Sequence, residues 1–388
     1  MDFKALKNTM LQQLRQLCAR PMLWVMMVLV PIGCTLFFLS LMDEGLPKKV
    51  PSGMIDNDHS SLSRSITRQL SAGELVDITS DYESYASAMA DVRSGKIFGF
   101  FVIPMDFQQD VFAGRTPTLE YYSNMTYFVP GTLAFKGFKT VAVTSAGGVL
   151  KATLTSTGIT GETTDALLQP VVIDATGIGN PWTNYTYYLT PSFMIALLAL
   201  MVMLVTVYTI TGEIKHDTSR EWLATAGGNI WTALAGKLLP QTFIFWLTGL
   251  AMGAIMFGYN HFPMAGNIWG MAFGLFLFVP ASQGFGLLVC SLIPNPRLAL
   301  SGVSLLGILT FSFAGFSFPV EDMYGAIGIF AYLVPTRYYF LIYINTALNG
   351  FPLYYVRWCF VALAMFLPLA LIFVPKLKKA LLNPVYVP

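Results

Sequence analysis

The sequence predicts a polytopic α-helical membrane protein with six transmembrane helices, an N-terminal interfacial helix, a re-entrant hairpin before the last span, and an α/β extracytoplasmic domain. Composition is the first observation: the 388 residues are 55% hydrophobic and 11% charged, with a mean hydropathy of +0.59, whereas soluble proteins carry roughly 25% charged residues. The second is that apolar runs of about 20 residues, long enough to span a bilayer, recur along the chain. The third is a polar stretch, residues 43–188, with the composition of a soluble domain.

Residues 1–20 are an amphipathic segment ahead of the first apolar run. Its apolar residues recur at helical spacing with basic residues between them, which predicts a helix in the membrane interface on the cytoplasmic side. A signal peptide is the alternative, but the run 21–42 is too long for its apolar region, and no small-residue cleavage site follows. We assign 21–42 as the first transmembrane helix, kinked at Pro31. The apolar residues are Phe3, Leu6, Met10, Leu14 and Leu17, and the basic ones Lys4, Lys7, Arg15 and Arg20.

The polar stretch 43–188 alternates strand and helix signals in its first part. Strands are expected at 52–58, 75–79, 97–104 and 117–124, with helices at 60–70 and 82–96 between them. Ser60 or Ser61 is the expected N-cap of the first helix, and Gly95 closes the second. A mostly helical segment from 131 to about 168 and a strand-like segment at 171–177 complete this extracytoplasmic (periplasmic) α/β domain.

Residues 191–374 contain the other five predicted spans, at 191–210, 234–258, 268–293, 298–316 and 356–374. Their apolar cores carry no charge; Lys237 and Arg357 lie near the ends, where long side chains can extend to the interface. Six spans place both termini on one side, and the positive-inside rule makes that side the cytoplasm. The tail 375–388 is then cytoplasmic, as are the basic residues Lys215, Arg220, Arg297, Lys376, Lys378 and Lys379.

The segment 317–355 is apolar and aromatic, yet proline and glycine residues interrupt it. Two short helices that dip into the outer leaflet fit better than a seventh span, because a seventh span would reverse the orientation of the tail. Their aromatic residues would lie at interface depth. We assign this segment as the re-entrant hairpin, with Pro319, Pro335 and Tyr338 as its marker residues.

Catalytic, metal and cofactor sites are not expected in this chain. An ATPase would need a GxxxxGK[ST] phosphate loop, and Gly236-Lys237 is followed by Leu238 instead. The three histidines are scattered over both sides of the membrane, and the spacing of the four cysteines fits neither a zinc site nor a disulfide framework. The lack of ionisable residues within the spans argues against a proton- or ion-driven transporter.

The segment 212–240 is a charged, amphipathic interruption between two apolar runs, and the topology places it in the cytoplasm. One interpretation is an ordinary cytoplasmic loop, which is charged because it is exposed to solvent. The other is a coupling helix at 212–233, on which a separate ATP-hydrolysing partner acts, because such a helix needs charged residues for the groove of the partner and an apolar face to transmit its tilt. The predicted coupling residues are Glu213, Lys215, Asp217, Thr218, Arg220, Glu221 and Trp222.

The order of these features resembles the ABC-2 family permeases, the transmembrane subunits of type V ABC exporters, and in particular the subgroup with a large periplasmic insertion after the first span. Within the insertion, MIDNDHSSLSRSI (54–66) and FFVIPMDFQQDVFAGRTPTLEYYSN (100–124) are similar to the recurring motifs of that subgroup. The coupling region departs from the family: Thr218-Ser219 precedes Glu221 and Ala226-Gly227 follows it, where Gly-Thr and Thr-Pro are common.

The resemblance implies a non-catalytic permease subunit of an ATP-driven exporter in the bacterial inner membrane, which moves an amphipathic, drug-like or lipid-like substrate. The expected partners are ABC ATPase subunits that bind ATP and Mg, a second permease copy or a sister permease, membrane lipid, and a membrane-fusion-type periplasmic adaptor. The second and fifth spans would line the path, although packing or lipid contact is an equal alternative for each residue. A membrane-anchored receptor or scaffold without transport is the alternative function. The path candidates are Phe193, Met201, Tyr208, Ser304, Phe311 and Phe316.

Overall fold

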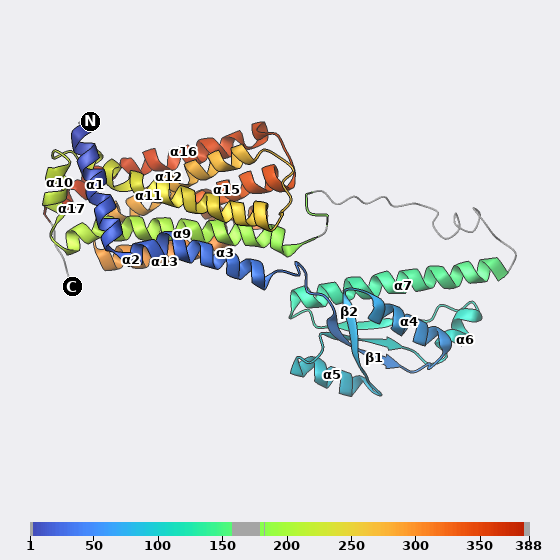
Figure 1. Ribbon diagram of the computed structural model, residues 1–388. Helices are drawn as coiled ribbons and strands as arrows, with labels where there is room; N and C mark the ends of the chain where they lie inside the picture. The colour runs from blue at the N-terminus through green and yellow to red at the C-terminus, as the bar shows by residue number, and fades with distance from the viewer. Residues whose placement is uncertain (1–2, 157–178, 182, 384–388) are drawn as a thin grey trace. The chain divides into compact units, whose positions relative to one another are not determined.

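The computed structural model describes residues 3–156, 179–181 and 183–383. The chain divides into two compact units, Met1–Gly45 with Gly177–Pro388, and Leu46–Thr176. The first is a bundle of helices and the second is an α/β unit (Figure 1). The predicted strand at 171–177 and the end of the predicted helical segment, 157–168, lie outside the described residues.

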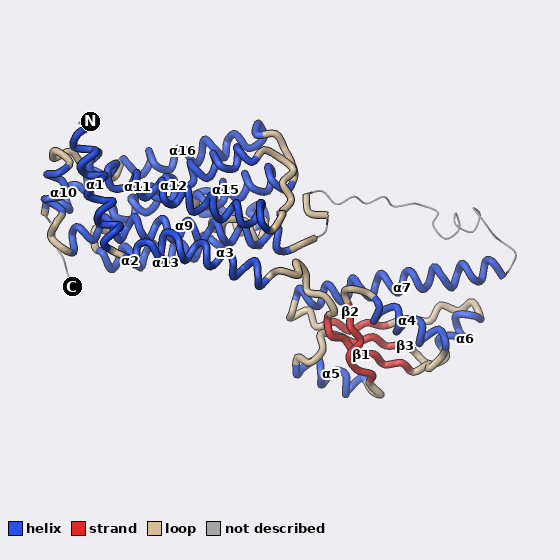
Figure 2. Tube along the Cα trace, in the orientation of Figure 1, coloured by secondary structure: helices blue, strands red, loops and turns tan. Residues whose placement is uncertain are grey.

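The α/β unit is built on a four-stranded sheet with the order β2-β1-β3-β4 (Figure 2). β1 is parallel to both β2 and β3, whereas β3 and β4 are antiparallel. Residue pairs Met54–Phe101 and Phe101–Tyr121 fix the register. The elements are β1 (Val50–Asp56), α4 (Ser61–Ala72), β2 (Val76–Asp81), α5 (Tyr85–Ser94), β3 (Gly99–Ile103), α6 (Phe107–Phe112), β4 (Glu120–Ser123) and α7 (Phe128–Ser156).

Helices cover both faces of this sheet, because its strands alternate apolar residues to both sides. Met54 and Phe101 pack with Ile66 of α4 and Ala134 of α7 on one face. Ile55 and Phe100 pack with Ala88 and Val92 of α5 on the other. The predicted order of strands and helices is therefore present, and the short helix α6 adds to it.

Local signals in this unit act as expected. The Ser60 hydroxyl accepts a hydrogen bond from the backbone N–H of Ser63 at 3.1 Å, which caps α4. Gly95 adopts the left-handed conformation (φ +77°) that ends α5.

The helical unit begins with α1 and continues through a broken first span. The π-helical turn Val25–Leu29 precedes Pro31, which lacks the backbone N–H that would extend a regular helix. This irregularity lies where a kink was expected. The bounds are α1 (Phe3–Ala19), α2 (Pro21–Trp24), α3 (Val30–Leu41), α9 (Tyr185–Lys215), α10 (Ser219–Thr225), α11 (Ile230–Gly253), α12 (Ile268–Leu292), α13 (Pro296–Phe313), α14 (Gly325–Tyr332), α15 (Pro335–Tyr343), α16 (Arg357–Leu371) and α17 (Val374–Leu382).

Six helical segments of the described chain are long and apolar enough to cross a membrane, in agreement with the number predicted. Several are longer than their apolar runs, because polar turns extend them at the ends. The segments are Pro21–Leu41, Tyr185–Lys215, Ile230–Tyr259, Ile268–Leu292, Pro296–Phe313 and Leu353–Leu382.

The segment before the last span is a bent pair of helices, Gly325–Tyr332 and Pro335–Leu348, which meet at 77°. Both flanks of the pair lie at the end of the bundle where α9 begins. The Tyr188 hydroxyl donates to the carbonyl of Phe316 before the pair, and the Tyr343 hydroxyl near its close donates to the carbonyl of Tyr187. The chain therefore enters and leaves this pair at one end of the bundle. The start of α1, α10 and α17 gather at the opposite end (Figure 1).

Candidate coupling site

The predicted coupling segment contains one short helix between the ends of two membrane-length helices. α9 ends at Lys215, the seven-residue helix α10 spans Ser219–Thr225, and α11 starts at Ile230. Asp217 turns the chain before α10 with a left-handed φ of +55°, and Gly227 and Gly228 turn it afterwards with φ of +69° and +73°. The segment predicted as the coupling helix, 212–233, therefore contains the end of α9, the separate helix α10 and the start of α11.

The predicted coupling residues separate onto two faces. Lys215, Asp217, Arg220 and Glu221 are exposed. Trp222 has 2% of its surface exposed, and Glu213 is also buried, so neither can enter the groove of a partner. The four exposed charges form an accessible rim, whereas Glu213 and Trp222 lie inside the bundle and Thr218 is half-buried.

Glu213 and Lys237 form a buried ion pair that joins α9 to α11. The Lys237 Nζ lies 2.5 Å from Glu213 Oε1, and the two side chains are 2% and 5% exposed, respectively. Lys237 also donates to the carbonyl of Thr209 at 3.1 Å and lies 4.5 Å from the centre of the Trp222 ring. The Thr218 hydroxyl donates to Glu213. A buried charge needs such partners, because its transfer from water costs several kcal/mol.

The expectation that Lys237 extends to the interface is wrong. The lysine points into the bundle because Glu213, at the end of the neighbouring helix, supplies a countercharge there. The two residues are 24 positions apart; Glu213 belongs to the predicted coupling segment and Lys237 to the predicted span that follows it. The sequence did contain a signal for this pair. One apolar run carries a single lysine, and a single glutamate follows the end of the preceding run.

Helix α1 packs against the same region. Thr9 lies over Gly236 of α11, so closely that a Cβ on Gly236 would stand 2.6 Å from the Thr9 Cβ. The Gln16 amide donates to Glu213 at 3.5 Å. Gln13 is buried between these two positions of α1, and its side-chain amide has no hydrogen-bond partner among the described residues. α1 is thus part of the polar cluster around Glu213.

The C-terminal helix α17 holds the other side of α10. The buried Ser219 hydroxyl donates to the carbonyl of Leu381 at 2.7 Å, and the Arg220 Nε donates to the carbonyl of Leu382 at 3.2 Å. Helix α10 is consequently fixed to the ends of α9, α11 and α17, while its charged rim stays exposed.

Some of the predicted path residues of the second and fifth spans lie close together. The rings of Phe193 in α9 and Phe311 in α13 are 5.7 Å apart. Phe316 is buried and stacks edge-on against Phe340, with ring centres 4.7 Å apart. Close approach of the two helices depends on Gly307, where a Cβ would stand 2.4 Å from Leu200.

The other three path candidates are less enclosed. Tyr208 is 39% exposed, whereas Met201 and Ser304 are half-buried. The Ser304 hydroxyl donates to the carbonyl of Leu300 within its own helix. The structure therefore brings α9 and α13 together, but of the six candidates it gathers only the three phenylalanines at one end of them.

The marker residues of the bent pair have structural roles. Pro319 precedes the 3₁₀ turn Val320–Asp322, and Pro335 is the first residue of α15. The Tyr338 hydroxyl donates to the carbonyl of Tyr332 across the bend at 2.8 Å. Sequence reasoning missed Arg337, which is buried and lies 3.5 Å from Glu321 and 5.0 Å from the Tyr332 ring centre.

Within the described parts of the chain, no group of three or more histidine, cysteine, aspartate or glutamate side chains is arranged to hold a metal ion. The coupling region holds a buried ion pair, Glu213–Lys237, next to the exposed charges of α10.

Comparison with known proteins gives one family and a small set of relatives. Residues 21–374 match the profile of the family described as ABC-2 family transporter protein. The chain is 21% identical over 348 residues to the probable multidrug ABC transporter permease YbhS of Escherichia coli K12, covering 87% of each chain. It is 24% identical over 160 residues to the probable multidrug ABC transporter permease YbhR of the same strain, covering 41% of this chain and 43% of the relative.

Proposed function

We propose that this chain, which belongs to the ABC-2 family of transporter proteins, drives export of an amphipathic, drug-like or lipid-like substrate with energy from ATP. In this family the permease is the transmembrane subunit, and a separate partner hydrolyses ATP. The relatives YbhS and YbhR are named as probable multidrug ABC transporter permeases, which supports an amphipathic cargo. ATP and Mg would be bound by the partner ATPase subunits.

The observation that carries the proposal is the two-faced helix α10. Its exposed charges, Arg220 and Glu221, suit a polar groove on an ATPase subunit. Its buried face contacts the Glu213–Lys237 pair, which joins two candidate membrane spans. Movement of α10 would therefore be transmitted directly to α9 and α11, because packed side chains and not a flexible loop connect them.

The path would form between α9 and α13 of two permease copies, or of one copy and a sister permease. Phe193 and Phe311 already meet within one copy, so a second copy would supply the facing wall. The half-buried Met201 and Ser304 and the exposed Tyr208 are the residues that such a wall could contact.

In this arrangement both termini and α10 lie in the cytoplasm of a bacterial cell, and the protein is in the inner membrane. The bent helices α14 and α15 would then be a re-entrant hairpin in the outer leaflet, because both flanks lie at the end of the bundle away from α10. The α/β unit would be periplasmic, where a membrane-fusion-type adaptor is its expected partner.

A charge exchange on α10 tests this proposal. Affinity-tagged protein is purified from its native host and the co-purifying proteins are identified by mass spectrometry. We expect an ABC ATPase with the native chain, and loss of it with the double variant Arg220→Glu, Glu221→Arg, since the rim charges would then meet like charges. Arg64→Glu, an exposed change on α4, is the matched control.

Two results would contradict coupling through α10. One is equal recovery of the ATPase with the exchanged and native chains, together with unchanged stimulation of ATP hydrolysis. The other is the absence of any ATPase from the native preparation, which would favour a membrane-anchored receptor whose α/β unit binds a ligand.

A further inference from the structure

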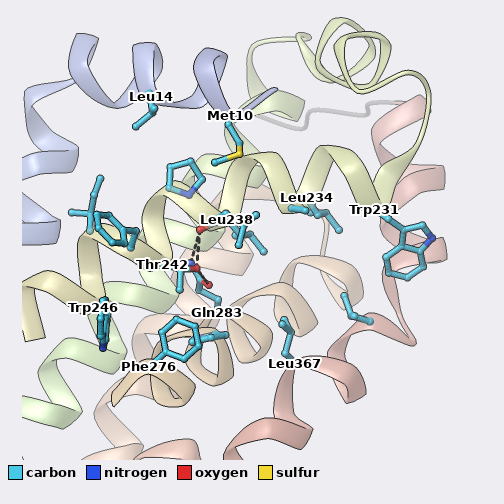
Figure 3. A pocket seen from close by; sticks show the side chains of 17 residues that line it. Met10, Leu14, Trp231, Leu234, Leu238, Thr242, Trp246, Phe276, Gln283 and Leu367 are labelled. Atoms are coloured by element: carbon cyan, nitrogen blue, oxygen red, sulfur yellow. Dashed lines mark hydrogen bonds between the residues drawn. The ribbon is translucent and has the colours of Figure 1, made fainter. Parts of the chain in front are cut away.

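A large apolar cavity lies beside the coupling region, between α1, α11, α12 and α16. Its volume is about 930 Å³, within the roughly 300–1,000 Å³ of small-molecule sites. Figure 3 shows Met10 and Leu14 of α1 on one side and Phe276 and Gln283 of α12 on the other, with Trp231 and Trp246 of α11 at opposite ends. The wall is almost entirely hydrocarbon and aromatic ring.

Three polar side chains of this wall, Thr242, Gln283 and Trp246, are already hydrogen-bonded to the protein. The Thr242 hydroxyl donates to Gln283 Oε1 at 2.7 Å, and the Gln283 amide donates to the carbonyl of Leu238 at 3.3 Å (Figure 3). The Trp246 indole N–H donates to the carbonyl of Ala272 at 3.2 Å. An occupant therefore gains from apolar contact along most of its length, as a hydrocarbon chain does.

The cavity is separate from the proposed path. Its lining residues come from α1, α11, α12 and α16, and neither α9 nor α13 contributes one. A molecule in transit between α9 and α13 would not pass through it. This separation favours a resident molecule over cargo.

The chemistry of α1 indicates what polar group would accompany the hydrocarbon. The cavity-facing residues Met10 and Leu14 share a helical face with Lys7, three positions before Met10. Lys7 is exposed, and no carboxylate of the described chain forms an ion pair with it. Helix α1 contains no acidic residue. An anionic group next to an apolar chain complements this surface.

We propose that the cavity binds the acyl chains of an anionic phospholipid from the leaflet on which α1 lies, with the lipid phosphate beside Lys7. The bound lipid fills the space between α1 and the three spans, and it keeps α1 packed over Gly236 and the Glu213 cluster. This site goes beyond the export function and does not depend on it, because it concerns a lipid that stays bound.

Lipid retention is the direct test. The full-length protein is reconstituted in nanodiscs of equal phosphatidylglycerol and phosphatidylcholine, released into a mild detergent, and analysed by native mass spectrometry for lipid that stays bound. Retention of phosphatidylglycerol in preference to phosphatidylcholine is expected. Ala235→Trp, which fills the cavity from α11, should abolish retention, whereas Leu305→Trp on the exposed face of α13 should not.

A charge substitution tests the headgroup contact separately from the acyl-chain contact. Lys7→Glu should lower phosphatidylglycerol retention at least about fivefold, the loss expected for one basic contact to an anionic lipid. Arg15→Glu is the control, because it makes the same change on a different face of α1. Equal effects of the two variants, or equal retention of both lipids, would overturn the assignment of an anionic headgroup.

A measurement on the unaltered chain covers the case in which a variant does not fold. Phosphatidylglycerol with a photoactivatable group in its acyl chain should crosslink to peptides of α1 and α11 that line the cavity. Crosslinks confined to α9 and α13 would indicate cargo in the path and would overturn the proposal. The proposal would also be overturned if the Ala235→Trp variant retained as much phosphatidylglycerol as the wild-type protein.

Discussion

Replacement of Lys237 by methionine should destabilise the helical unit severely. Methionine keeps most of the length and volume of the side chain, and it removes the charge. Glu213 then remains buried, with Thr218 and Gln16 as its hydrogen-bond donors and no cation within ion-pairing distance among the described residues. The perturbation is therefore the loss of one countercharge with little change in packing.

The magnitude follows from the geometry of the pair. At 2.5 Å, the attraction between unit charges in an effective dielectric constant of about 20 is about 6–7 kcal/mol. Desolvation costs several kcal/mol per ion and offsets most of this gain. When one partner is removed, the attraction disappears but the cost of burying the other remains, so the expected loss is about 3–5 kcal/mol.

Reversible unfolding in mixed micelles with increasing dodecyl sulfate measures this change, followed by tryptophan fluorescence. Lys215→Met is the matched control: it removes an exposed lysine from the end of α9, and it should change the free energy of unfolding by less than about 0.5 kcal/mol. The double variant Glu213→Gln, Lys237→Met leaves no unpaired charge. It should recover most of the stability, with a coupling free energy of at least about 2 kcal/mol.

The double-mutant cycle also gives the result that would refute this reasoning. If the two single losses simply add in the double variant, the residues do not interact as a buried pair. If Lys237→Met is as stable as Lys215→Met, the lysine is solvated in the protein, and the cluster cannot be the rigid link beneath α10.

Three further changes test other parts of the structure. Gly236→Val should place methyl groups against α1 and cost about 1–3 kcal/mol, whereas Gly212→Val faces open space and should cost less; unfolding in micelles compares them. Ser60→Ala should destabilise α4 by about 1 kcal/mol, read as faster amide hydrogen exchange in its first turn. The pKa of Asp91 is held below its ordinary value, chiefly by the hydrogen bond from Lys96, so its stabilising effect is complete above about pH 4 and lost as the pH falls through the lowered pKa. Asp91→Asn should remove that part of the acid sensitivity in a pH series of hydrogen exchange.

Much of the architecture could be predicted because it depends on local patterns. Long apolar runs give the candidate spans, and the cap at Ser60 and the glycine at position 95 give helix ends in the α/β unit. The observed helices begin and end several residues away from the predicted limits, because polar turns at their ends pack on neighbouring elements. Such packing is not encoded in the hydropathy of a single run.

The coupling region was only half predictable for the same reason. Its charged composition indicated a surface for a partner, and Arg220 and Glu221 are indeed exposed. Whether Glu213 faces out or in depends on Lys237, which a different helix supplies. The buried Arg337 likewise depends on Glu321 and an aromatic ring brought close by the bend between α14 and α15. Pairings of this kind arise from tertiary structure.

The two faces of α10 imply two separable kinds of variant. Exchange of Arg220 and Glu221 alters exposed charges and removes the hydrogen bond from Arg220 to the carbonyl of Leu382. Each contributes about 1 kcal/mol or less to stability, so the exchange should weaken partner binding with only a small change in unfolding. Loss of Lys237 has the opposite effect. The exposed charges of α10 are unchanged, but the buried ion pair that links α10 to α9 and α11 is broken. The double variant Glu213→Gln, Lys237→Met, which keeps most of the stability, is therefore expected to bind the ATPase normally and to fail to transmit its movement. If only the rim variants impair transport, the buried pair serves folding alone.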